Sequence, residues 1–181
     1  MKDENTIIGW WSGGVTSAVA CYLTIQLYGV ENCRIIFIDT HNEHDDTYRF
    51  KLDCERWYGT KIETITSDKY NSIEEVWLKY NALNNAKGAV CSAELKRAVR
   101  QKWEKENTYK HQVFGFDMSE TQRAVSMTLN YGKTARPIYP LLFHGYVKKD
   151  CIKIIEDAGI RIPEAYLLGL LNNNCLKHSR S

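Results

Sequence analysis

Six consecutive residues near the start of this 181-residue chain are suited to binding an anion: Ser12, Gly13, Gly14, Val15, Thr16 and Ser17. An apolar run precedes them and a mostly apolar segment follows, which is typical of a buried strand that passes into a helix. Glycines let backbone N–H groups come close to a phosphate, and the first turn of a helix offers unpaired N–H groups and a positive dipole end. A strand–helix turn with a serine cap is the simpler alternative, but it does not account for the whole string.

Two polar residues, Asp39 and Thr40, directly follow a second apolar run, 34–38. At such a position they either cap a loop or face a ligand. Glu43 and the two histidines beside it suggest a metal site, but their spacing is that of a loop and the ligand set is incomplete. We therefore expect Glu43 and these histidines to be solvated, and we predict no metal site.

Charged residues that suit an anion lie in two later segments. Lys96 and Arg97 stand near the start of a basic amphipathic helix, where they are either a solvated face or phosphate ligands. Glu120 and Arg123 are three residues apart on another predicted helix. That spacing suits a surface ion pair as well as a pair of residues at a substrate site.

The elements that must position these residues alternate along the chain. Apolar runs of strand length alternate with segments of helical period, and this predicts an α/β fold with three layers, a mostly parallel sheet with helices on both faces. The predicted strands are 6–11, 34–38, 61–65 and 111–116, and the predicted helices are 15–28, 45–58, 72–80, 92–106, 119–130 and 147–159. Because ligands bind beyond the C-terminal ends of parallel strands, the loops after residues 11, 38 and 116 should share one edge.

Composition limits the class of protein. The length predicts one domain over residues 1–181, and the net charge of +2 does not favour a dedicated nucleic-acid-binding protein. Six scattered cysteines form no C-x-x-C pair, so we expect no iron–sulfur cluster or zinc site from this chain alone. The chain has no apolar run long enough to span a bilayer, and its polar start is unlike a signal peptide. We expect a cytoplasmic protein without membrane contact.

The anion-binding stretch resembles the Ser-Gly-Gly-x-x-Ser signature of the PP-loop, the pyrophosphate-binding loop of adenine nucleotide alpha hydrolases. It lacks both G-x-x-x-x-G-K and G-x-G-x-x-G. Four later segments, 37–50, 91–97, 115–123 and 137–175, resemble motifs of the phosphoadenosine phosphosulfate (PAPS) reductase family in the right order. The resemblance implies a Rossmann-like fold of the alpha hydrolase type and a site for an adenine nucleotide, either ATP or an adenylyl sulfate.

The resemblance also implies roles for residues outside the loop. The end of the second strand, Asp39 and Thr40, would contact the nucleoside. Lys96 and Arg97 would bind phosphate, and Arg123 would clamp an anion. The same resemblance places two further residues at the nucleotide, Gly115 and Glu120.

Two features depart from the family pattern. Relatives often carry Lys-Asp or Val-Asp inside the loop, where this chain has Val15-Thr16, so one carboxylate contact to a magnesium ion is lost. The family's nucleophilic cysteine lies in a Glu-Cys-Gly-Ile/Leu-His tail that this chain lacks, and we expect residues 137–181 to be a short C-terminal extension. Cys175 is our candidate for thiol chemistry, since Lys177 and His178 would lower its pKa, although an inert thiol is an equal alternative.

Three functions stay open at this point. The first is an enzyme that either cleaves ATP at the α-phosphate, with magnesium, or reduces an adenylyl sulfate, with a thioredoxin-like partner to resolve the product. The second is a nucleotide-binding module without turnover, as a sensor or as part of a larger complex. The third is thiolation of a nucleic acid, for which the helix 92–106 would supply charge and three tryptophans would supply stacking: Trp57, Trp77 and Trp103. Whether the chain forms a homodimer also stays open.

Overall fold

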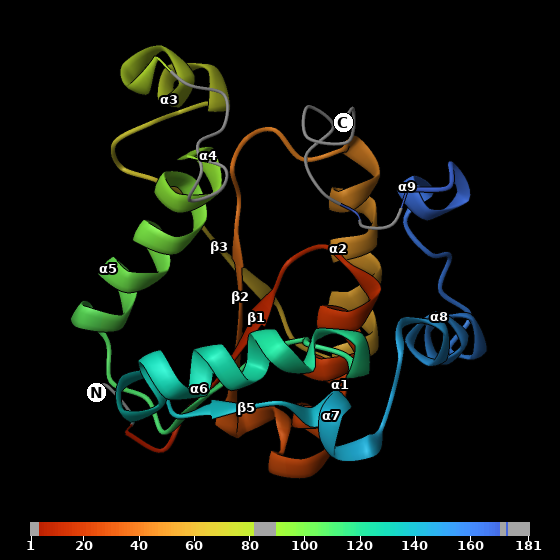
Figure 1. The fold of residues 1–181 in the computed structure, drawn as a ribbon. Helices are drawn as coiled ribbons and strands as arrows, with labels where there is room; N and C mark the ends of the chain where they lie inside the picture. The colour runs from red at the N-terminus through yellow and green to blue at the C-terminus, as the bar shows by residue number, and fades with distance from the viewer. Residues whose placement is uncertain (1–3, 82–89, 171–172, 174–181) are drawn as a thin grey trace.

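Five strands form one parallel sheet in the order β3-β2-β1-β4-β5 (Figure 1). The computed structural model describes residues 4–81, 90–170 and 173. The strands are β1 (Ile7–Trp11), β2 (Cys33–Ile38), β3 (Ile62–Ile65), β4 (His111–Val113) and β5 (Pro137–Ile138). The α/β fold is confirmed. Among the strands, β4 ends three residues earlier than predicted, and β5 was not expected.

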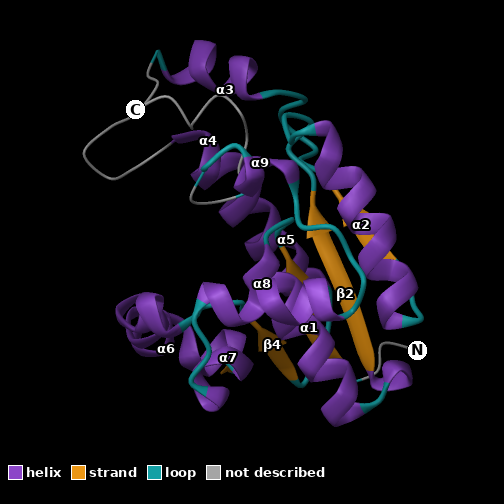
Figure 2. Cartoon of the chain, turned by 90° about the vertical axis from the view of Figure 1, so that its right-hand side faces the viewer, coloured by secondary structure: helices purple, strands orange, loops and turns teal. Residues whose placement is uncertain are grey.

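Helices connect the strands and cover both faces of the sheet (Figure 2). The longer ones are α1 (Val15–Tyr28), α2 (Asp45–Tyr58), α3 (Ile73–Tyr80), α5 (Ala98–Glu106), α6 (Thr121–Ala135) and α8 (Lys148–Asp157). Shorter helices are α4 (Val90–Ser92), α7 (Pro140–His144) and α9 (Glu164–Leu167), with 3-10 turns η1 (Val30–Asn32) and η3 (Met118–Glu120). One segment, η2 (Ala93–Arg97), is a π-helical turn between α4 and α5.

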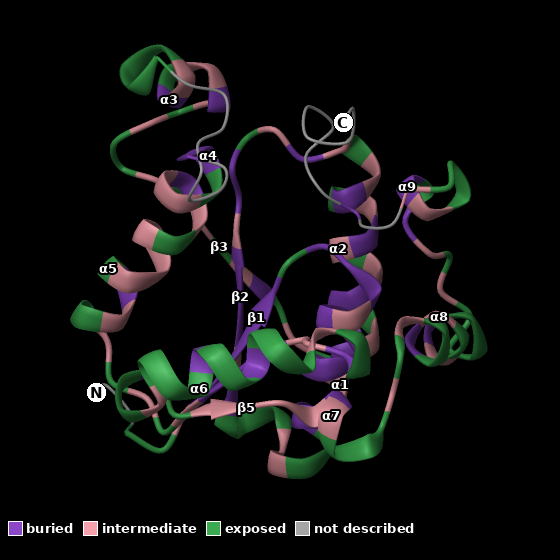
Figure 3. Ribbon diagram, viewed as in Figure 1, coloured by how far each residue is buried: buried purple, intermediate pink, exposed green. Residues whose placement is uncertain are grey.

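Alternate residues of the central strand face the two helical layers. Ile7 and Trp11 of β1 pack into a core with α1, α2, α7 and α8, whereas Ile8 and Trp10 pack into a second core with α5 and α6. This division follows from the two-residue period of a strand. All five residues of β1 are buried, which explains why its sequence is a continuous apolar run (Figure 3).

Helix α1 lies in the middle of the first layer. It contacts β1 on one side and α8 on the other. Its residues Val15, Ala18 and Val19 are fully buried. Because this helix is packed so closely, its N-terminus is held rigidly at the end of β1.

The strand order changes direction at β1. From β1 the chain adds β2 and β3 on one side, and then returns to add β4 and β5 on the other. In open parallel sheets, a crevice forms beyond the strand ends at such a switch point. The loops after β1, β2 and β4 therefore meet at one edge, as the sequence predicted.

The C-terminal segments pack along the first layer. β5 extends the sheet, α8 covers α1, and α9 is joined to α2 because Asp46 Oδ2 accepts a hydrogen bond from the Glu164 N–H at 2.8 Å. No helix within the described ranges is both long enough and apolar enough to cross a membrane. The cytoplasmic location stays a prediction.

Candidate functional site

The loop between β1 and α1 wraps around the hydroxyl of Ser17. Ser17 Oγ accepts hydrogen bonds from the Ser12 N–H at 3.0 Å and the Ser12 hydroxyl at 3.1 Å, and it donates to the Gly14 carbonyl at 2.9 Å. A hydroxyl has one proton and two lone pairs, so these three bonds use its full capacity. Ser17 therefore shapes the loop, and its proton is directed to the Gly14 carbonyl. A contact of its side chain with an anion stays a prediction.

Two glycines allow the loop to turn. Gly13 has a φ of 84°, a conformation that side chains rarely adopt, and Gly14 is the N-cap of α1. The first turn of α1 contains no acidic residue. Its positive dipole end is therefore not compensated by a carboxylate from its own helix, as an anion site requires.

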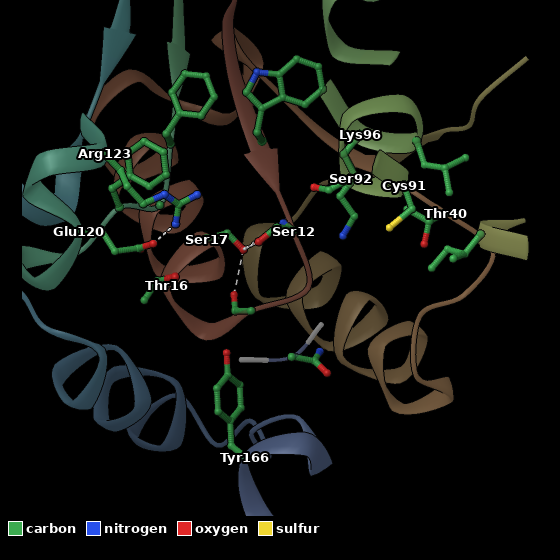
Figure 4. A pocket seen from close by; sticks show the side chains of 18 residues that line it. Ser12, Thr16, Ser17, Thr40, Cys91, Ser92, Lys96, Glu120, Arg123 and Tyr166 are labelled. Carbon is green, nitrogen blue, oxygen red and sulfur yellow. Dashed lines mark hydrogen bonds and ion pairs between the residues drawn. The ribbon is translucent and has the colours of Figure 1, made fainter. Parts of the chain in front are cut away.

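A cleft of about 430 Å³ opens beside this loop. Figure 4 shows Thr16, Glu120 and Arg123 on one side of it, with Thr40 and Lys96 on the other. Of the predicted residues, Ser12, Gly14, Thr16, Ser17, Thr40, Lys96, Gly115, Glu120 and Arg123 line the cleft. Segments from four parts of the chain are thus brought to one edge of the sheet.

Gly115 lets the loop after β4 approach the N-terminus of α1. A Cβ built at Gly115 would lie 2.5 Å from Ser17 Cα and 2.6 Å from Ser17 N. These are backbone atoms inside a packed helix, which cannot move aside as the end of a side chain can. The absence of a side chain at Gly115 therefore sets how closely the two halves of the cleft meet.

Lys96 lies in the π-helical turn and forms an ion pair. Its Nζ is 3.2 Å from Glu43 Oε1, which also accepts a hydrogen bond from the Thr40 hydroxyl at 2.9 Å. The Glu43 side chain is fully buried, and its Oε2 has no partner within the described residues. Glu43 is thus not the solvated loop residue that we expected. A π turn inside a helix is rare and often occurs at functional sites.

Arg123 forms an ion pair and also lies at the cleft, the two alternatives that its spacing from Glu120 left open. It is paired with Glu120, one turn earlier, while both residues line the cleft. Its guanidinium also lies over the ring of Phe116, 4.6 Å from the ring centre. The surface ion pair and the position at a ligand site are therefore compatible.

The match to a family model covers more than half of the chain. The phosphoadenosine phosphosulfate reductase domain matches residues 6–109. The chain belongs to the PAPS reductase family. This matched range carries the glycine loop, Asp39, Thr40 and Lys96 of the PP-loop fold.

Solved structures show the same fold. The phosphoadenylyl-sulfate (PAPS) reductase from Candida auris, determined as a phosphate complex, is similar with a TM-score of 0.71 and 17% identity, over 96% of this chain and 83% of that one. The U34-tRNA thiolase NcsA from Methanococcus maripaludis, with its 4Fe–4S cluster, is similar with a TM-score of 0.55 and 18% identity, over 97% of this chain and 61% of that one. No curated protein matches the sequence significantly.

Some residues that we predicted to contact the ligand in this PAPS reductase family member do not line the cleft. Val15 is fully buried in the core, and Arg97 is exposed outside the cleft. Asp39 is buried and fixes its own loop, because it accepts hydrogen bonds from the His41 N–H at 2.8 Å and the Tyr48 hydroxyl at 3.0 Å. Gly13 allows the loop to turn and does not line the cleft. Cys175, our candidate for thiol chemistry, lies outside the described residues.

Aromatic side chains form a wall that sequence reasoning missed. Trp10, Phe114 and Phe116 line the cleft. Phe114 and Phe116 are two residues apart, and their rings are stacked with centres 6.0 Å apart. Their alternation is the available signal, but it lies inside the predicted strand 111–116, and the observed strand β4 ends at Val113.

Two C-terminal residues, Tyr166 and Asn173, also reach the loop. The Tyr166 hydroxyl accepts a hydrogen bond from the Val15 N–H at 3.3 Å, and the Asn173 side chain donates to the Gly13 carbonyl at 2.8 Å. Both residues line the cleft. They lie more than 150 positions from the loop in sequence, and no local pattern predicts that contact.

Two of the three tryptophans proposed as a stacking surface for a nucleic acid pack against other aromatic rings. Trp103 is buried and packs edge-on against Trp10, with ring centres 5.5 Å apart. Trp57 is stacked on Tyr22 at 4.0 Å. Trp103 therefore has no face free to receive a base, whereas Trp57 is half-buried and one face of its ring is covered by Tyr22.

The described lining of the cleft includes one thiol and no cluster of metal ligands. Cys91 lines it and is buried, and burial raises the pKa of its thiol. In the part of the chain that the structure describes, no three His, Cys, Asp or Glu side chains come together as a metal site. The expectations of no metal and no iron–sulfur cluster stay predictions.

Proposed function

We propose that this protein binds an adenine nucleotide by its phosphates at the loop 12–17 and acts in sulfur-transfer or adenylylation chemistry. The observation that supports the proposal is that the glycine loop and two cationic side chains, Lys96 and Arg123, line one cleft at the switch point of the sheet. Membership of the PAPS reductase family supports an enzyme of this general class.

The arrangement suits a reaction at the phosphate chain. Loop N–H groups and Lys96 would stabilise negative charge on phosphate oxygens as it develops. With ATP, an acceptor would attack the α-phosphorus, and the bond to the β-phosphate would break to give an adenylylated acceptor and pyrophosphate. This route needs no cysteine of the protein.

The reductive route needs a thiol that attacks the sulfur of an adenylyl sulfate. Cys175 is the candidate, and a thioredoxin-like partner would then supply the electrons that release sulfite. Cys91 lines the cleft, but burial holds its thiol protonated. We therefore favour the adenylylation route on the described residues.

The described residues do not form a magnesium site of their own. Thr16 stands where relatives often have an acid, and Glu120, the one carboxylate among the described residues that line the cleft, is paired with Arg123. No step in the proposal therefore depends on a metal held by the protein. A magnesium ion would arrive bound to the phosphates of ATP.

Calorimetric titration with ATP and with adenylyl sulfate, each with and without magnesium, tests this proposal. We expect binding of at least one nucleotide and its loss in Gly14→Val, since a side chain at Gly14 would fill the phosphate's space. A protein that binds neither nucleotide, or a Gly14→Val variant with unchanged affinity, would refute the loop assignment. Release of labelled pyrophosphate from ATP then separates an enzyme from a binding module.

Thiolation of a nucleic acid is the second candidate. The structural likeness to a tRNA thiolase favours it only at the level of the fold. If it is correct, tRNA should bind with an affinity that falls steeply as salt rises. A gel shift over a salt series measures this directly.

A further inference from the structure

The hydroxyl of Tyr166 occupies a position at the phosphate-binding loop. It accepts the N–H of Val15 at 3.3 Å. Val15 is the first residue of α1, and the N–H groups of the first turn have no partner within a helix. Figure 4 shows Tyr166 with its hydroxyl directed toward the loop and into the cleft.

We propose that Tyr166 belongs to the anion-binding machinery and donates a hydrogen bond to the pyrophosphate or sulfate end of the nucleotide. This inference rests on the proposed function, because it requires the loop to be the nucleotide site. It adds a donor that the loop sequence does not contain.

The proton of the Tyr166 hydroxyl is available to a ligand. A tyrosine hydroxyl has a single proton, and the bond from Val15 uses one of its lone pairs. Within the described residues, this hydroxyl donates no hydrogen bond. Burial raises the pKa of this hydroxyl, which outweighs the lowering by the backbone of Val15 and Asn173, so the group stays a neutral donor at pH 7.

The segment that carries Tyr166 is anchored on both sides of it in the sequence. Asn173 is 3% exposed, and its amide donates to the Gly13 carbonyl at 2.8 Å and to the Thr47 hydroxyl at 3.1 Å. On the other side, the Glu164 N–H donates to Asp46 at the start of α2. Tyr166 lies between these anchors, so its hydroxyl is positioned before a ligand arrives.

Gly14 makes room for this arrangement. A Cβ at Gly14 would be 3.1 Å from Tyr166 Oη, which is closer than an ordinary contact. A larger side chain at Gly14 would therefore displace Tyr166 as well as a phosphate. The variant Tyr166→Phe separates the two effects, because it removes one hydroxyl and adds no atom to the loop.

The experiment compares wild type, Tyr166→Phe and Tyr109→Phe by calorimetry with ATP, inorganic pyrophosphate and adenosine. Tyr109→Phe is the matched control, since its hydroxyl donates to the Thr134 carbonyl at 3.1 Å and does not line the cleft. Losing a hydrogen bond to a charged group should weaken ATP and pyrophosphate binding of Tyr166→Phe about tenfold to a hundredfold. Adenosine should bind as in wild type, and Tyr109→Phe should match wild type throughout.

The outcomes are distinguishable. If wild type binds ATP and Tyr166→Phe binds it equally well, the inference about Tyr166 is wrong while the proposed function stands. Tighter ATP binding by Tyr166→Phe would mean that the hydroxyl blocks the phosphate position, and would also overturn the inference. An equal loss of adenosine binding would show a structural role instead. If wild type binds none of the three ligands, the proposed function fails and the inference fails with it.

Discussion

Gly115→Ala tests how closely the two halves of the cleft must meet. The new Cβ would lie 2.5 Å from Ser17 Cα, whereas ordinary contacts begin at 3.4 Å. The loop after β4 and the first turn of α1 must therefore separate by about 0.9 Å, the difference between these two distances. The atoms of Ser17 that the new Cβ would meet are backbone atoms, so no side-chain rotation can relieve the contact.

The expected cost has two parts. Overpacking of this kind typically costs about 1–3 kcal/mol of the free energy of unfolding. For a chain of this size, each kcal/mol lost from the free energy of unfolding lowers the melting temperature by about 2–4 °C. The melting temperature of Gly115→Ala should therefore fall by about 2–12 °C. A displacement near 1 Å at the start of α1 should also weaken ATP binding by about tenfold to a hundredfold.

Thermal melting and calorimetry on the same preparations measure both parts. The matched control is Gly132→Ala in α6, where the new Cβ meets only Thr128 Cγ2 at 3.6 Å. This control should raise the free energy of unfolding by about 0.5–1 kcal/mol, because alanine is the better helix former. The reasoning is refuted if Gly115→Ala melts and binds ATP like wild type, or if Gly132→Ala loses as much stability as Gly115→Ala.

Three further variants test the charged groups. Lys96→Ala should weaken ATP binding by about tenfold and lower the free energy of unfolding by about 1–3 kcal/mol, because the buried Glu43 loses its cation. Adding Glu43→Gln to this variant should restore most of the melting temperature but not the affinity for ATP. Unchanged melting of Lys96→Ala would show that the pair contributes nothing. Asp46, whose pKa the hydrogen bonds from Arg49 lower to about 2, stabilises the fold above its unfolded pKa of 3.8, and this stabilisation is lost as the pH falls through about 2. Asp46→Asn should therefore flatten the decline in melting temperature between pH 4 and pH 2, and parallel curves for variant and wild type would contradict this.

The sequence was informative wherever local chemistry decides the structure. Continuous apolar runs located β1 and β2, and glycines such as Gly29 and Gly59 marked the ends of α1 and α2. The parallel arrangement then followed from the alternation of strands and helices. This was sufficient to predict that the loops after β1 and β2 meet the loop after β4 at one edge.

The partners of individual side chains could not be predicted in this way. The pairing of Lys96 with Glu43 and the contact of Tyr166 with Val15 both depend on segments brought together by the fold. Strand β5 has only two residues and contains a proline, so its pairing comes from the position of the neighbouring strand rather than from propensity. The role of Ser17 could not be read from the sequence, because a hydroxyl at a loop has the same sequence signature whether it binds an anion or closes the turn.

The pairing of both cleft cations has a consequence for the rate of association. Among the described lining residues, Lys96 and Arg123 each have a carboxylate partner, so the charged side chains at the cleft nearly cancel. Long-range steering of a highly charged ligand requires an excess of opposite charge. An incoming nucleotide would therefore be drawn in only over the last few ångströms, by the N–H groups at the start of α1, and its on-rate would depend little on ionic strength.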